Sequence, residues 1–396
     1  MRWNLVYTHF SLLMLTFSLA TYAQKLEIGI FNETQLKSLA LSVMQGDYVV
    51  STNNEILATL DTNEILYVTF TGKGFDIRSK KEFLINTKEI EIKSIRPDAF
   101  IKISPLSTNQ NSRIYKGDLN IATDYTKLKL ILSINIDDYL AGVVETEVGI
   151  GRSLEFYKAH AVIARTYAIK HFTKHIGEGF HLCDGVHCQA IKKFCSEPKI
   201  KQAIVETNNE VIRERDTNLI TAVFHANCGG QTANSEDVWL VSLPYLRSVR
   251  DPYCTSSKQA QWEKSISIDK WKQYLRNQGF SVGNIGDQEL SSISTSRKKY
   301  YVIRNDSLKL SIIRTDWNLK SSYFNIKAEG NEIHFAGKGY GHGVGLCQEG
   351  AMRMAELGSD YKEILSFYYK NVEIVNVKNL KLQFNNYFPL TNEYGE

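Results

Sequence analysis

Residues 137–175 read DDYLAGVVETEVGIGRSLEFYKAHAVIARTYAIKHFTKH, and the rest of the chain is expected to be organised around this segment. Asp137 and Asp138 are suited to cap a short helix, because their carboxylates accept hydrogen bonds from first-turn N–H groups. Two glycines then interrupt this helix, since glycine favours turns. Ser153 is a suitable cap for a second helix, which continues without a helix breaker to the end of the stretch.

The second helix is predicted to be buried. Alanines alternate with branched and aromatic residues along it, so apolar groups cover most of its surface. Arg165 is the exception, and a guanidinium on a buried helix needs a carboxylate or carbonyl partner, for which Glu147 is one candidate. The alternative is an arginine at the edge of the helix whose charged end reaches solvent.

Glu147 is the candidate catalytic residue. It lies between an apolar segment and the start of the long helix, where a carboxylate can be partly desolvated and still meet a ligand. The alternative is a structural acid that pairs with Arg165 or with a loop amide.

The composition and residues 1–23 indicate where in or outside the cell the protein is expected to be. The chain has 396 residues, of which 43% are hydrophobic, and a net charge of +4, and no basic cluster favours nucleic-acid binding. Arg2 precedes an apolar run at 10–20 and small residues at 21–23, so residues 1–23 are predicted to be a signal peptide. A retained membrane anchor is the alternative, although the run is short for a spanning helix. The protein is therefore expected to be exported, to the periplasm or the outside of the cell.

The pattern predicts an α+β fold, with a β-rich N-terminal part packed on a mixed helix and strand domain that holds one long buried helix. Short alternating runs predict strands, and the apolar spacing at 262–280 predicts an amphipathic helix. The expected divisions are a β-rich domain at 24–120, a catalytic domain at 121–380 with a β-rich insertion at about 255–335, and a tail at 381–396.

A metal site is predicted directly after the long helix. Two thiols and up to three imidazoles fall within residues 175–188, around an Asp-Gly turn, as in tetrahedral zinc sites with sulfur and nitrogen ligands. The predicted ligands are Cys183, His187, Cys188 and either His175 or His181. Such a closed site is expected to be structural. A Cys183–Cys188 disulfide is the alternative, because exported proteins form disulfides.

Two later segments are candidates for ligand binding. Residues 229–239 combine two glycines with polar side chains that suit a sugar, including Ser235 and Glu236, and end in Trp239, which either stacks on a sugar ring or packs in the core. Residues 337–351 contain glycines at alternate positions around His342, so that the backbone at Gly343 can approach a ligand. The alternative to a functional role is that His342 is a packed structural residue. The P-loop ending is missing here, which argues against nucleotide binding.

The chain resembles the SpoIID/LytB family, named for the stage II sporulation protein D and an amidase-enhancer protein. Eight segments carry the resemblance, in order: 115–119, 139–147, 158–168, 183–189, 229–239, 244–249, 339–345 and 364–369. This chain departs from the family pattern at Cys347, where a serine is common, and at Val148-Gly149, where methionine and proline are common.

The resemblance implies a lytic transglycosylase that acts on peptidoglycan glycan strands and leaves a 1,6-anhydro-N-acetylmuramic acid end. It implies that Glu147 is catalytic and that zinc is held by His175, Cys183, His187 and Cys188. We further take as substrate-binding candidates Arg165, Ser235, Glu236, His342 and Gly343. The alternative is a wall-bound activator of an N-acetylmuramoyl-L-alanine amidase, which would be its partner. The pairing of Cys195, Cys228, Cys254 and Cys347 stays open, because four cysteines allow three pairings.

Overall fold

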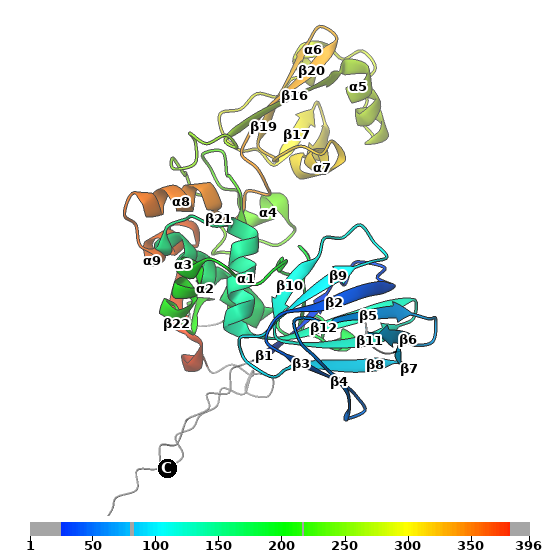
Figure 1. Cartoon of the computed structure of the whole chain (residues 1–396). Coiled ribbons are helices and arrows are strands. Elements are labelled where there is room, and N and C mark those ends of the chain that lie inside the picture. The colour runs from blue at the N-terminus through cyan, green and yellow to red at the C-terminus, as the bar shows by residue number, and fades with distance from the viewer. Residues whose placement is uncertain (1–24, 80–82, 216–217, 381–396) are drawn as a thin grey trace, which may run out of the picture.

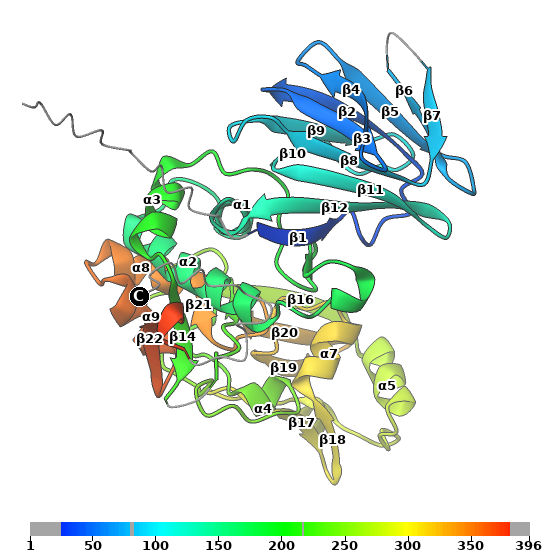
Figure 2. The same ribbon diagram turned by 90° about the horizontal axis from the view of Figure 1, so that it is seen from below.

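The computed structural model describes residues 25–79, 83–215 and 218–380, and it has the mixed α+β architecture expected from the sequence. The predicted signal peptide and C-terminal tail lie outside the described residues. Figure 1 shows the smaller β-rich part above the N-terminal β-rich part, with α1 and α2 to the left of the N-terminal part, and Figure 2 shows the same helices on the left. None of the described helices is both long enough and apolar enough to cross a membrane.

Two sheets form the N-terminal part. The first contains, in order, β13 (Leu182–Cys183), β1 (Lys25–Ile30), β12 (Lys127–Asn135), β11 (Asp118–Asp124), β8 (Glu89–Ser94), β3 (Tyr48–Thr52) and β4 (Glu55–Leu60). The second contains β10 (Arg113–Lys116), β9 (Phe100–Pro105), β2 (Ser38–Gln45), β5 (Ile65–Phe70), β6 (Phe75–Arg78) and β7 (Phe83–Thr87). Every second residue of β12 is buried, and apolar residues from both sheets share one core. Because β12 belongs to the first sheet, this β-rich part continues past residue 120 to Asn135.

A group of helices lies beside this part, and the first of them begins at the residue after β12. They are α1 (Ile136–Val148), α2 (Leu154–Lys170), η1 (Ile176–Glu178), α3 (Pro198–Glu206), α8 (Gln348–Glu356), α9 (Tyr361–Tyr368) and η2 (Val377–Asn379), beside the β14 (Glu210–Glu214) and β22 (Val372–Asn376) pair. The buried helix is α2, which packs against α1, α3, α8 and α9. Its alanines are in the core, because small side chains allow the other helices to approach closely.

Two helix boundaries differ from those predicted, the start of α1 and the end of α2. Asn135 caps α1 by accepting a hydrogen bond from Asp137 N at 2.7 Å, so the two aspartates occupy the first turn instead of the cap. The helix continues until Gly149, whose φ of 71° ends it, and Glu147 therefore lies in its last turn. Ser153 caps α2 as predicted, but α2 ends at Lys170, short of residue 175.

The smaller β-rich part has its own core around Trp271. It contains β16 (Gln261–Ser267), α5 (Ile268–Asn277), α6 (Asp287–Leu290), β17 (Tyr300–Ile303), β18 (Asp306–Lys309), α7 (Leu310–Asp316), β19 (Phe324–Glu329) and β20 (Glu332–Lys338). The helix predicted over 262–280 is wrong in its first turns, because Gln261–Ser267 pairs with β20 as a strand. Trp262 covers Gly337 of that strand so closely that a side chain at 337 would collide with it.

Candidate active site and metal centre

Glu147 is partly buried at the end of α1. Its Oε1 accepts a hydrogen bond from Ala190 N at 3.1 Å. Burial raises the pKa of this carboxyl above its ordinary value, against the opposing effects of the Ala190 N–H and the positive charge of Lys192. With its pKa raised in this way, the carboxyl group holds its proton to a higher pH than an ordinary glutamate does, as a general acid requires.

Glu145, on the same turn, has the opposite environment. Its carboxylate accepts hydrogen bonds from Ser196 N at 2.6 Å and Glu197 N at 3.2 Å, and it pairs with Lys193 Nζ at 2.6 Å. Burial raises the pKa of Glu145, but Lys193 and the surrounding donors outweigh burial and lower it to about 2. Glu145 therefore remains charged and fixes the 193–197 segment to α1.

The four predicted metal ligands lie together. One ligand atom from each of His175, Cys183, His187 and Cys188 falls within 4.8 Å of the others. His175 Nε2 lies 3.4 Å from Cys188 Sγ, and both cysteines are free thiols. Two sulfurs and two nitrogens at this spacing suit a tetrahedral ion, so the donor set fits zinc.

The surroundings of these ligands distinguish the two candidate histidines. His175 Nδ1 lies 2.5 Å from Glu178 Oε1, which orients the ring so that Nε2 faces the sulfurs. His181 instead accepts a hydrogen bond from Glu27 N through Nδ1 at 2.9 Å. The geometry therefore groups His175, and not His181, with the other ligands.

The metal loop (residues 182–192) is attached both to the N-terminal sheets and to α2. Its β13 strand pairs with β1, and Asp184 accepts hydrogen bonds from Phe31 N at 2.8 Å and from the buried Arg113 guanidinium. Gln189 donates to Ala164 O of α2 at 3.3 Å. Sequence reasoning missed Asp184 and Arg113 as anchors, because they are far apart in the sequence and nothing nearby in the chain connects them.

Arg165 does not contact Glu147. It is 3% exposed and donates hydrogen bonds to the carbonyls of Ile204 at 3.1 Å and Thr207 at 2.8 Å, at the end of α3, and to Glu210 O at 3.3 Å. Both the pairing with Glu147 and the solvent-reaching alternative are wrong, because unpaired carbonyls at a helix end satisfy the guanidinium inside the core. Because the Arg165 side chain is buried, it is also poorly placed to bind substrate.

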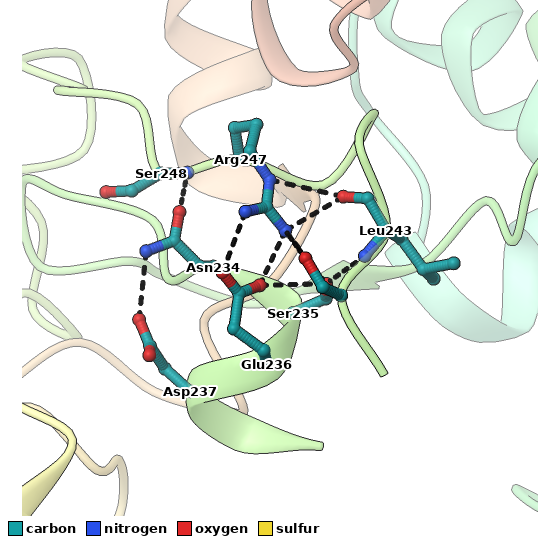
Figure 3. A network of polar contacts seen from close by, with 8 residues as sticks. Asn234, Ser235, Glu236, Asp237, Leu243, Arg247 and Ser248 are labelled. Carbon is teal, nitrogen blue, oxygen red and sulfur yellow. Dashed lines mark hydrogen bonds and ion pairs between the residues drawn. The ribbon is translucent and has the colours of Figure 1, made fainter. Parts of the chain in front are cut away.

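Figure 3 shows the polar network around Ser235 and Glu236, which lie on the short helix α4 (Ser235–Val238). Arg247 binds both Glu236 oxygens, at 2.7 and 2.5 Å, and donates to Leu243 O at 2.9 Å. Ser235 is fully buried, and its Oγ accepts a hydrogen bond from Leu243 N at 2.8 Å. These side chains, expected to face a sugar, are engaged in holding the 234–248 loop in shape.

The two glycine-bearing segments lie side by side. β15 (Phe224–His225) pairs in parallel with β21 (Leu346–Cys347), and Ala233 N donates to Gly343 O at 2.7 Å. His342 is partly buried, with its ring centre 5.4 Å from Trp239 and 5.5 Å from His225. Burial lowers the pKa of His342 to about 4, so this imidazole is neutral at physiological pH.

His225 is a site residue that sequence reasoning missed. It is 4% exposed, and its Nδ1 lies 3.0 Å from Val344 O. Within the described residues its buried Nε2 has no hydrogen-bond partner. The pairing of β15 with β21 brings it beside His342.

The candidate residues thus form two groups. Glu147 and the metal loop make one, joined through Ala190, while His342, Gly343, Ser235 and Glu236 belong to the other. Among the hydrogen bonds of the described residues, none joins Glu147 to the second group. α2 connects them indirectly, since it packs on α1 and its His160 ring lies 5.1 Å from Phe224 of β15.

Sequence comparison relates this chain to known proteins. A sequence model described as "Stage II sporulation protein" (SpoIID) matches residues 124–213, which cover α1, α2 and the metal loop. The chain is 33% identical over 276 residues to an uncharacterized protein of Brachyspira hyodysenteriae, covering 68% of this chain and 74% of that one.

Two relatives come from Bacillus subtilis. The "Stage II sporulation protein D" is 29% identical over 262 residues, 61% of this chain and 75% of its own length. The "Amidase enhancer" is 29% identical over 290 residues, 60% of this chain but only 40% of its own. The protein described above therefore belongs to the SpoIID family.

Proposed function

We propose that this protein cuts peptidoglycan glycan strands by a lytic transglycosylase reaction with Glu147 as the acid and base. The observation that carries the proposal is the setting of Glu147, a partly buried carboxyl group held by one backbone N–H, whereas N–H donors and Lys193 surround Glu145. Burial accordingly raises the pKa of Glu147. The SpoIID family match supports it, and so does the likeness to a sporulation protein.

The reaction requires one carboxyl group in two protonation states. Protonated Glu147 donates to the glycosidic oxygen between N-acetylmuramic acid and N-acetylglucosamine, and that C–O bond breaks. The carboxylate then takes the proton of the C6 hydroxyl, whose oxygen bonds to C1 and closes the 1,6-anhydro ring. The Ala190 N–H holds Oε1, which leaves Oε2 to carry the proton.

Zinc held by His175, Cys183, His187 and Cys188 has a structural role in this proposal. The ion would tie the metal loop, through Cys183, His187 and Cys188, to His175, and Ala190 in that loop in turn positions Glu147. A zinc amidase would need an open metal position, which four protein ligands do not leave.

A second candidate function is activation of an N-acetylmuramoyl-L-alanine amidase without glycan cleavage. The likeness to the amidase enhancer favours it, although this chain spans only 40% of that relative. Both candidates act on the cell wall, so both require export to the periplasm or beyond, as the N-terminal sequence predicts.

The deciding experiment measures anhydro-muropeptides released from intact sacculi and from glycan strands without stem peptides. Glu147→Gln is expected to lower the rate about 100-fold or more, since it cannot supply the proton. The matched control is Glu206→Gln, which also removes a carboxylate from the last turn of a helix but at an exposed position, and should retain the wild-type rate.

If Glu147→Gln releases these products at the wild-type rate, Glu147 is not the catalytic acid. If the wild type releases none but accelerates an amidase on the same sacculi, the activator function holds instead.

A further inference from the structure

A second cluster of metal-binding side chains lies in the core. One ligand atom from each of Cys228, Asp251, Cys254 and Cys347 falls within 4.8 Å of the others, and all four residues are at most 1% exposed. They come from three segments: the turn after β15, the 251–254 turn, and the start of α8. We propose that this cluster is a second, structural zinc site with three sulfur ligands and one carboxylate.

The distances suit a shared ion. Cys228 Sγ lies 3.4 Å from Cys254 Sγ and 3.2 Å from Asp251 Oδ2. A tetrahedral zinc ion with Zn–S bonds of about 2.3 Å separates its sulfur ligands by roughly 3.8 Å. Small movements of the side chains therefore place all four ligand atoms around one ion.

Hydrogen bonds from neighbouring groups hold two of the proposed ligands, Cys347 and Asp251, in position. Cys347 Sγ accepts hydrogen bonds from Cys228 N at 3.3 Å and from Gly350 N at 3.4 Å, where α8 begins. Asp251 accepts from Tyr368 Oη at 2.9 Å and from Tyr253 N at 2.9 Å. N–H donors stabilise a thiolate, and oriented carboxylates bind metal more tightly.

The backbone at Gly350 packs directly against Asp251 and Tyr368, so that no side chain fits there. A Cβ atom at Gly350 would lie 2.4 Å from Asp251 Oδ2 and 2.2 Å from Tyr368 Oη. The guanidinium of Arg297 lies nearby and donates to Cys228 O at 2.8 Å and Gln231 O at 2.6 Å. Three thiolates and a carboxylate leave a net negative charge around a divalent ion, and the partly buried Arg297 guanidinium offsets that charge.

A disulfide is the competing interpretation, because Cys228 and Cys254 are neighbours and the protein is predicted to be exported. That bond would use two of the four groups and leave the Cys347 thiol and the Asp251 carboxylate buried against it. Zinc uses all four. The remaining cysteine, Cys195, lies elsewhere, with its thiol donating to Glu197 O at 3.6 Å.

The zinc content of the purified mature chain tests this site, independently of whether the protein cuts glycan. We expect about two zinc ions per wild-type chain, and about one after either Cys188→Ser in the loop site or Cys347→Ser in the second. Cys195→Ser, a buried cysteine outside both clusters, should retain about two. Circular dichroism checks that each variant is folded.

The Cys188→Ser variant keeps the test decisive even if Cys347→Ser does not fold. X-ray absorption of its remaining zinc should show three sulfurs and one oxygen, whereas the loop site has two sulfurs and two nitrogens. Zinc-free Cys188→Ser protein would overturn the proposal. So would a Cys228–Cys254 disulfide found by peptide mapping of unreduced wild type, or unchanged zinc content in folded Cys347→Ser.

Discussion

Glu145 and Glu147 have the same side chain on the same turn of α1, and their surroundings separate their chemistry. Glu145 meets N–H donors and Lys193, so its pKa falls to about 2. Glu147 is desolvated with one backbone donor, and its pKa rises. These two glutamates, two residues apart, therefore have different roles, because only Glu147 lies in an environment that disfavours its charged form.

The stability of Glu147→Gln relative to wild type should depend on pH. A raised folded pKa means that the unfolded chain loses this proton first, so the wild type loses stability as pH rises above the ordinary carboxyl value. We expect the variant to gain stability relative to wild type from about pH 4 upward, until the raised pKa is passed. Urea denaturation across this pH range measures it.

Glu145→Gln is the control with the opposite sign. Its lowered pKa contributes stability above the ordinary carboxyl value and loses it as pH falls toward 2, so this variant should be about 2 kcal/mol less stable at neutral pH. A pH-independent difference for Glu147→Gln would show that its carboxyl is not desolvated.

Arg165 joins α2 to the end of α3 and to the start of β14 through backbone carbonyls. Replacing it with methionine keeps the apolar stem but leaves the carbonyls of Ile204 and Thr207 unpaired in the core. We expect a loss of about 3 kcal/mol in the free energy of unfolding. Arg152→Met, at an exposed position, should change it by less than about 0.5 kcal/mol. Equal effects of the two changes would mean that the guanidinium does not stabilise the α2–α3 packing.

The elements that the sequence predicted well are those determined by local signals. The alanine pattern of α2 and its Ser153 cap are visible in one continuous stretch. The first turns of the predicted 262–280 helix failed because Gln261–Ser267 is held as a strand by β20, which lies far along the chain. Helical spacing of a few apolar residues cannot reveal such a partner.

The same distinction applies to the whole molecule. The first metal site could be predicted because its ligands fall within a short stretch, from His175 to Cys188. The second cluster could not, since its ligands extend from Cys228 to Cys347 and meet only through folding. The same is true of His225 beside His342, which depends on the pairing of β15 with β21.

The metal loop connects the N-terminal sheets to the candidate catalytic residue, so losing its metal should affect both. In Cys188→Ser we expect faster amide hydrogen exchange at Leu182 and Cys183, which pair with β1, and at Ala190, which binds Glu147.

The melting temperature should also fall, by about 5 °C or more. Residues 261–338, with their separate core, provide the internal reference and should exchange as in wild type. Hydrogen exchange followed by mass spectrometry resolves these segments. Unchanged exchange at Ala190 in the metal-depleted loop would mean that the metal does not position Glu147, and the proposed structural role of the ion would be wrong.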